Sequence, residues 1–161
     1  MRRFILSIAL CLASISLFSQ TYRLESLFED KVSETRLSYW NMLDDPQPSK
    51  VDTFSLWGYK RYTDSWEYAY EVEYFKGDPE QTFNFLTKVA DFAEKYQNED
   101  KIQTRISGMK VRTMKRGMFK YTFVYDKYER DCCPFAAKHW NEMRDKFVEF
   151  CKQMNIKYQE E

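Results

Sequence analysis

Residues 54–75, FSLWGYKRYTDSWEYAYEVEYF, contain the clearest pattern in the chain and decide the expected fold. From Trp66 to Tyr74, aromatic and β-branched residues alternate with glutamate or alanine. A period of two with such residues is typical of a half-buried strand. With residues 62–65 as the turn, this strand folds back on the one before it, and the two form a hairpin. That register predicts three cross-strand pairs: Trp57 with Tyr70, Tyr59 with Tyr68, and Lys60 with Glu67.

A helix is expected directly after this hairpin, over residues 79–96. Asp78 is a good N-cap, Pro79 suits the first helical position, and Gln81 completes a capping box. Apolar residues then recur at helical spacing along one broad stripe, which contains Phe85, Leu86, Val89, Phe92, Ala93 and Tyr96. The stripe predicts that one side of the helix packs on the sheet.

The second half of the chain repeats the order of hairpin and helix. Residues 109, 111 and 113 alternate with Lys110 and Arg112, and the aromatic residues at 119, 121, 123 and 125 alternate with Lys120 and Thr122. A three-residue loop over 115–117 keeps both apolar sets on one face, with Gly117 in the left-handed conformation that such loops need. Gly108 is expected to mark a bulge. From Pro134 to about Met154, a second apolar stripe at helical spacing predicts a helix: Ala136, Trp140, Met143, Phe147, Cys151 and Met154.

These elements predict an α+β domain over residues 51–158, with the order ββαββα. Two hairpins form one four-stranded antiparallel sheet, and both helices pack on its aromatic face. The outer sheet faces carry complementary charges, which we expect to form cross-strand ion pairs worth about 0.2–1 kcal/mol each. The alternative is a pair of separate recognition strips. The acidic set is Glu67, Glu71 and Glu73, and the basic set is Lys110, Arg112 and Lys120.

Three further segments precede this domain. The apolar spacing of residues 21–45 predicts a short N-terminal helical segment, and the prolines within residues 46–50 predict a linker. Residues 1–20 have a basic start at Arg2 and Arg3 and a short apolar run, as secretory signal peptides do. We expect cleavage near Ser19 or Gln20 and export to the periplasm or the extracellular space. Cys11 is a poor lipoprotein site because Leu10 is large.

The composition of the exported chain excludes several classes of function. Loss of Arg2 and Arg3 reduces the 25 basic residues to 23, against 25 acidic ones, so no nucleic acid is expected as a partner. The apolar run is too short to predict a transmembrane helix in the mature chain. A single histidine excludes most multi-histidine metal sites, and four scattered glycines form no phosphate-binding loop. We therefore expect neither a metal nor a cofactor.

Residues 129–140, ERDCCPFAAKHW, contain the main candidate for catalytic chemistry. If the last helix begins at Pro134, Cys133 lies near its N-cap, where the helix dipole favours a thiolate. His139 is the nearest base, but six positions after Cys133 it lies on another face of that helix. Cys132 and Cys133 also lack the C-x-x-C spacing of redox sites. These three residues are therefore weak candidates, and small half-buried residues at a helix start are the simpler interpretation.

The aromatic residues of the first hairpin suggest a different site. If their face were open, they would form a stacking platform for a sugar; if the helices cover it, they belong to the core. The candidate ligand-binding residues are Trp57, Tyr59, Trp66, Tyr68 and Tyr70. The leading hypothesis is an exported, non-enzymatic binding domain of the cell envelope whose ligand the sequence does not identify, with an envelope protein or a glycan as the partner. A carbohydrate-binding module is the first alternative, and a thiol enzyme or redox protein at Cys132 and Cys133 is the second.

Overall fold

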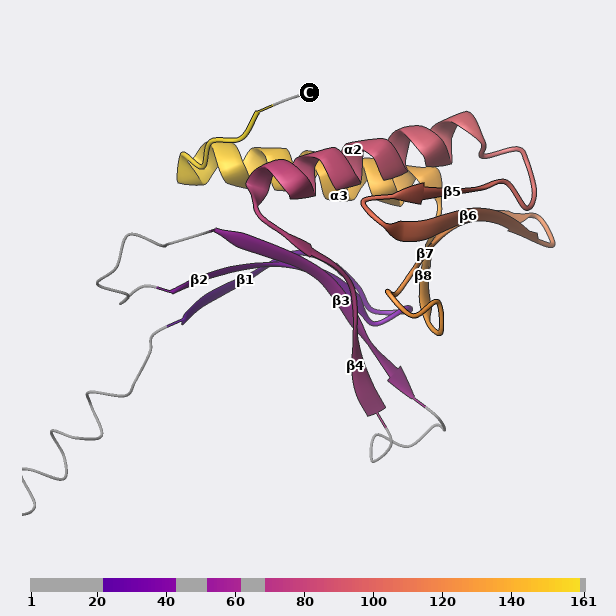
Figure 1. Cartoon of the computed structure of the whole chain (residues 1–161), viewed down its shortest axis with the longest axis horizontal. Coiled ribbons are helices and arrows are strands. Elements are labelled where there is room, and N and C mark those ends of the chain that lie inside the picture. Colours follow the sequence, from indigo (N-terminus) through magenta and orange to yellow (C-terminus); the bar gives the residue numbers. More distant parts are fainter. Residues whose placement is uncertain (1–21, 43–51, 62–68, 160–161) are drawn as a thin grey trace, which may run out of the picture.

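The computed structural model describes residues 22–42, 52–61 and 69–159, which form an α+β fold with two four-stranded antiparallel sheets (Figure 1). The first sheet contains β1 (Tyr22–Asp30), β2 (Thr35–Met42), β3 (Thr53–Arg61) and β4 (Ala69–Gly77). The second contains β5 (Gln103–Ile106), β6 (Met109–Arg116), β7 (Phe119–Tyr125) and β8 (Cys132–Phe135). Helix α2 (Pro79–Lys95) follows β4, and α3 (Ala137–Met154) follows β8. The order is ββββαββββα, so the predicted single sheet with the order ββαββα is wrong.

The N-terminal segment predicted as helical forms strands β1 and β2 instead. Strand β1 has a bulge between Ser26 and Phe28, where its register against β2 shifts by one residue. A bulge interrupts the alternation of a strand. Leu24, Leu27 and Phe28 therefore have the spacing of a helix turn although they lie in a strand. The predicted linker over residues 46–50 lies outside the described residues.

The hairpin of β3 and β4 is present, but its register differs from the predicted one. Trp57 pairs with Glu73, Tyr59 with Glu71, and Lys60 with Tyr70. The register shifts beside Leu56 because β4 contains an extra residue there, and Tyr74 and Phe75 are both buried. A bulge places consecutive residues toward one side, which strict alternation does not anticipate. The predicted turn and its neighbours, residues 62–68, lie outside the described part of the chain.

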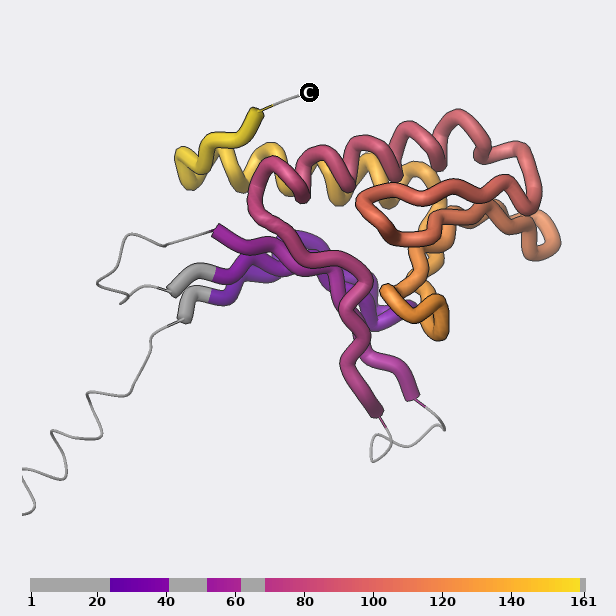
Figure 2. Tube along the Cα trace, in the orientation of Figure 1, coloured from indigo at the N-terminus to yellow at the C-terminus, as the bar shows by residue number. Residues whose placement is uncertain are grey.

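Helix α2 forms where its capping signals predicted it. Asp78 caps the helix by accepting from the Gln81 amide, and the Gln81 side chain accepts from the Asp78 amide. Helices α2 and α3 run antiparallel, side by side, on the same face of the β1–β4 sheet (Figures 1 and 2). Aromatic contacts join the two layers: Phe75 stacks on Phe85 at 4.1 Å between centroids, and Phe54 meets Phe147 at 4.7 Å. This layer contains most of the buried core.

The second sheet includes two strands that the sequence did not predict, β5 and β8. Strand β8 contains Pro134 and lies at the sheet edge, where a residue without an amide hydrogen is tolerated. Helix α3 therefore starts at Ala137 and not at Pro134. The β6–β7 loop has two residues, since Arg116 pairs with Phe119, and the predicted three-residue loop is wrong although Gly117 has a positive φ of 63°. Gly108 (φ 81°) belongs to the β5–β6 turn and not to a bulge.

The separation into two sheets also prevents the predicted ion pairs between the hairpins. Glu71 and Glu73 lie on β4, whereas the basic residues lie on β6 and β7 of the other sheet. Glu71 instead accepts a hydrogen bond from Tyr59 at 3.1 Å, and Lys110 pairs with Glu129 at 2.9 Å. Neither helix in the described part of the chain is long and apolar enough to span a bilayer.

Candidate functional site

The strongest candidate site is the face of the β1–β4 sheet that points away from the helices, here called the open face. Strand pairing places Arg36 of β2 opposite Trp57 of β3, and Trp40 opposite Thr53, on this side. Their neighbours along β2, Leu37 and Tyr39, point to the helices and are fully buried. In Figure 1 both helices lie on the other side of the sheet. Among the described residues, the open face therefore presents aromatic side chains that no helix covers.

Trp57 lies near the centre of the open face and is held by its neighbours. Its indole N–H donates to Ser38 Oγ at 3.0 Å, and Ser38 is buried. The Arg36 guanidinium lies 5.7 Å from the centroid of the Trp57 ring, in cation–π range. Arg36 in turn donates to Glu29 on β1 at 3.0 Å. These contacts fix the orientation of a half-buried tryptophan on the surface.

Tyr59 extends the aromatic surface along β3. Its ring contacts Trp57 edge-on, with 5.3 Å between centroids and 78° between planes. Its hydroxyl donates to Glu71 on β4 at 3.1 Å, and this hydrogen bond to a carboxylate raises the pKa of Tyr59 above its ordinary value. At the other end of the face, Leu24 of β1 pairs with Trp40 of β2. The Leu24 side chain is 53% exposed and the Trp40 side chain is 39% exposed. The surface is thus amphipathic, with ordered aromatic rings and charges of both signs.

The five ligand-binding candidates that were identified from the sequence do not all lie together in the structure. Trp57 and Tyr59 lie together on the open face. Tyr70 points to the opposite side of the sheet, where its hydroxyl donates to Asp131 at 3.1 Å. Trp66 and Tyr68 lie outside the described residues. Trp40 and Arg36 were missed because their segment was interpreted as helical, and the alternation over residues 35–40 was the signal that could have identified them.

The cysteine candidates occupy a strand and not a helix start. Cys133 on β8 pairs with Val124, is fully buried, and its Sγ lies 3.7 Å from the Val124 carbonyl oxygen. Burial raises its pKa well above the ordinary value. Cys132 points to the other face of the same strand and is half-buried, and burial is the main cause that raises its pKa as well. The N-cap of α3 is Ala136, so neither cysteine lies at the N-cap position where the helix dipole was expected to favour a thiolate.

His139 and Cys151 lie apart from this pair of thiols. His139, in the first turn of α3, packs against the rings of Phe28 and Phe135, with centroid distances of 6.5 and 6.1 Å. No hydrogen bond joins it to a cysteine within the described ranges. Cys151 is buried on α3, and burial raises its pKa to about 12. Residues 22–42, 52–61 and 69–159 contain no group of histidine, cysteine and carboxylate side chains that could hold a metal ion.

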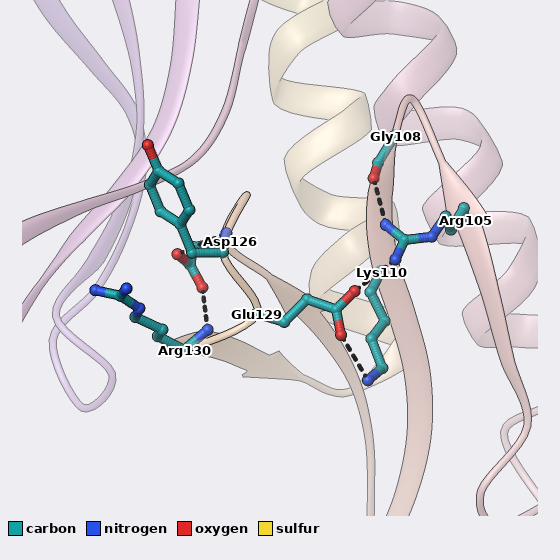
Figure 3. Close-up of polar contacts among 7 residues, drawn as sticks. Arg105, Gly108, Lys110, Asp126, Glu129 and Arg130 are labelled. Atoms are coloured by element: carbon teal, nitrogen blue, oxygen red, sulfur yellow. Dashed lines mark hydrogen bonds and ion pairs between the residues drawn. The ribbon is translucent and has the colours of Figure 1, made fainter.

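A polar cluster fixes the loop between β7 and β8 (Figure 3). Asp126 is buried, and its carboxylate accepts the backbone amides of Tyr128, Arg130 and Asp131 at 2.7–3.1 Å. Glu129, with a positive φ of 57°, bridges Arg105 at 2.6 Å and Lys110 at 2.9 Å.

These contacts lower the pKa of Glu129, chiefly through the hydrogen bond from Lys110. Both cations pair with this one carboxylate, so the triad of side chains keeps a net positive charge. The cluster therefore holds the loop, and with it the start of β8.

Comparison with protein-family models, with curated proteins and with solved structures found no match for this chain. The function is therefore inferred from the surfaces described above.

Proposed function

We propose that this protein is an exported, non-enzymatic domain that binds a protein partner of the cell envelope through the open face of the β1–β4 sheet. The observation that carries the proposal is Trp57, which Ser38 and Arg36 orient on a sheet face that no helix of the described residues covers. Trp40 and Tyr59 flank it. Tryptophan, tyrosine and arginine are the residues most enriched at the energetic centres of protein interfaces. Ring orientations that are fixed before binding also reduce the entropy lost on association.

The arrangement of the rings favours a protein over a sugar. A stacking platform needs aromatic planes that lie parallel to the ligand, but Trp57 and Tyr59 meet at 78°. Arg36 also lies over the Trp57 ring. Charged side chains of both signs surround the rings. Such charges also form the rim of protein interfaces, where they set specificity and association rate.

The thiol alternative receives little support from the structure. A nucleophilic cysteine requires a lowered pKa and access to substrate. Cys133 has neither, because it is fully buried and its pKa is raised. Cys132 is half-buried with a raised pKa, and His139 packs among phenylalanine rings.

The test begins with a photo-crosslinking amino acid at position 40 in cells that produce the full chain. Any captured protein is then purified and its affinity measured for the mature chain and for two variants, Trp40→Ala and Tyr59→Ala. A loss of affinity of about 30-fold or more is expected for each variant, since such residues typically cost about 2 kcal/mol or more at hot spots. Tyr128→Ala is the matched control, because this tyrosine is 70% exposed in the β7–β8 loop.

Two results would overturn the proposal. If Tyr128→Ala weakens binding as much as Trp40→Ala, the open face is not the interface. If a glycan changes the tryptophan fluorescence of the wild type and Trp40→Ala abolishes that change, the face is a carbohydrate site. Mass spectrometry of the secreted chain, with a mature N-terminus near Gln20 expected, tests the export part separately.

A further inference from the structure

Positive charge is concentrated in one part of this otherwise balanced chain. Residues 101–130 contain nine basic side chains and two acidic ones, whereas the remaining residues contain 16 basic and 23 acidic ones. This segment comprises β5, β6 and β7 and the loops that join them. The second sheet is therefore the cationic part of the protein, and the first sheet with its helices carries the balancing negative charge. Such asymmetry indicates an anionic partner for the second sheet.

The end of the β6–β7 hairpin, residues 115–120, combines this charge with exposed apolar side chains. Met118 is 93% exposed and Phe119 is 65% exposed, at adjacent positions in and beside the turn. Figure 1 shows this turn at the outer end of the molecule, away from the β1–β4 sheet. Isolated exposed apolar residues are common, but here both lie among lysine and arginine side chains. We call residues 115–120 the hairpin tip.

The strand register places two like charges opposite each other at this tip. Lys115 pairs directly with Lys120, an arrangement that destabilises a sheet. Within the described ranges, neither lysine nor Arg116 forms an ion pair with a carboxylate. Lys120 donates to the side-chain amide oxygen of Asn98, and Arg116 lies over the Phe123 ring at 5.5 Å.

The nearest acidic group is on the loop before β5. The Asp100 carboxylate accepts the backbone amide of Lys115 at 3.0 Å. It does not form an ion pair with the ammonium group of that lysine. The paired lysines therefore remain available to an external anion, which would relieve their repulsion.

We propose that the hairpin tip binds an anionic lipid bilayer, with Met118 and Phe119 in the interface and Lys115, Arg116 and Lys120 against the lipid phosphates. An apolar tip surrounded by cations matches the order of layers in a bilayer surface. A soluble polyanion offers phosphates or carboxylates but no apolar layer for Met118 and Phe119. Because the tip and the open face lie on different parts of the molecule, membrane contact leaves the open face free. This proposal does not depend on the protein-binding function.

The first experiment measures co-sedimentation of the full mature chain with phosphatidylcholine vesicles, with and without phosphatidylglycerol. Binding is expected only with phosphatidylglycerol, and it falls as salt is added. Replacing Lys115 and Lys120 with glutamine lowers the partition coefficient by roughly 5-fold for each lysine, following the typical contribution of one basic residue at an anionic surface. The control Lys31→Gln with Lys138→Gln removes two exposed lysines elsewhere and leaves binding unchanged.

The apolar part of the proposal has its own variants. Met118→Asp with Phe119→Asp is expected to abolish binding, whereas Val32→Asp is not, although Val32 is 95% exposed. Brominated lipids quench tryptophan that enters the bilayer, so a Phe119→Trp chain that is quenched more strongly than the wild type, which has four tryptophans of its own, reports insertion of the tip. Urea unfolding of each variant confirms that all are folded, which is expected since every substituted side chain is exposed.

Three outcomes would overturn the proposal. The first is equal binding to vesicles with and without phosphatidylglycerol. The second is binding that survives Met118→Asp with Phe119→Asp while a soluble polyanion such as heparin competes for it, which would identify the tip as a polyanion site. The third is a Phe119→Trp chain that sediments with the vesicles but is quenched no more strongly than the wild type.

Discussion

The hydroxyl of Tyr70 on β4 lies 3.1 Å from both carboxylate oxygens of Asp131, the residue before β8. This hydrogen bond joins the first sheet to the second across 61 residues of sequence. Helix α3 makes a second connection between the sheets. Its Phe147 packs on Phe54 of the first sheet. The indole N–H of its Trp140 donates to the Thr122 carbonyl of the second sheet at 3.3 Å. The relative position of the two sheets is therefore fixed by a few specific contacts.

Tyr70→Phe is expected to lower the free energy of unfolding by about 1–2 kcal/mol, because the partly buried Asp131 loses a charged hydrogen bond. Urea unfolding measures this loss. A double-mutant cycle with Asp131→Asn isolates the pair, and a coupling energy of about 0.5 kcal/mol or more is expected. Tyr128→Phe removes an exposed hydroxyl and serves as the control. Additive effects of Tyr70→Phe and Asp131→Asn would show that the bond does not hold the sheets together.

Gly58→Ala is expected to destabilise the first sheet by roughly 1–3 kcal/mol through overpacking. A Cβ atom at position 58 would lie 2.9 Å from the Glu34 backbone oxygen, which accepts the Tyr59 amide. Because backbone atoms cannot move aside like the end of a side chain, the β1–β2 turn must shift. Thermal unfolding measures the loss, and an unchanged melting temperature would mean that the turn adapts freely.

The buried thiols predict a loss of stability at alkaline pH. The pKa of Cys133 and that of Cys151 are both raised by burial, so folding holds these groups neutral while the unfolded chain ionises them. Their contribution is fully present below the ordinary thiol pKa and decreases as the pH rises above it, by about 1.4 kcal/mol per pH unit for each thiol. Urea unfolding at pH values from about 8.5 to 10 measures the slope. Cys133→Ala or Cys151→Ala should reduce it, and an unchanged slope would contradict burial of that thiol.

Alkylation with iodoacetamide tests the cysteines one by one. Cys133 and Cys151 are expected to react only on unfolding, because they are fully buried. Cys132 is half-buried with a raised pKa and should react more slowly than a free thiol at neutral pH. Peptide mass spectrometry over a range of pH gives each rate. Fast reaction of Cys132 or Cys133 with a pKa below the ordinary value would instead support an activated thiol site.

Glu129→Gln is expected to lower stability at neutral pH and to have no effect in strong acid. The pKa of Glu129 is lowered, so its contribution is present above the ordinary glutamate pKa and is lost as the pH falls through the lowered value. Unfolding by urea at pH 7 and at a series of decreasing pH values follows this loss. Glu99→Gln controls for the loss of one exposed negative charge. A difference between wild type and variant that persists in acid would show that the substitution disturbs the loop by other means.

Local signals in the sequence were sufficient for some elements. Helix α2 has its cap at Asp78 and Gln81 because both partners of the capping box lie within four residues. Gly117 has the positive φ expected of a glycine in that hairpin, although the loop is one residue shorter than predicted. The α+β class followed from these signals together with the alternation in β3, β4, β6 and β7.

The candidate site was only partly predictable. Trp57 and Tyr59 were identified from alternation, but the same pattern is produced whether their face is open or covered. Trp40 and Arg36 were missed because residues 21–45 were interpreted as helical, although these two residues alternate with the buried Leu37 and Tyr39 along β2. The thiol hypothesis depended on a helix start at Pro134, and an edge strand that contains a proline has no strong local signature.

The sequence by itself determined the positions of α2 and of the alternating strands, since hydrophobic period and capping depend on neighbours within one or two turns. Only the tertiary structure decided that the strands form two sheets. It also decided that the helices cover one face of β1–β4 and leave Trp57 on the other. Those choices depend on which apolar faces meet between segments far apart in the sequence, and many pairings bury similar areas. Contacts such as Phe54 with Phe147 and Tyr70 with Asp131 therefore select the arrangement that forms.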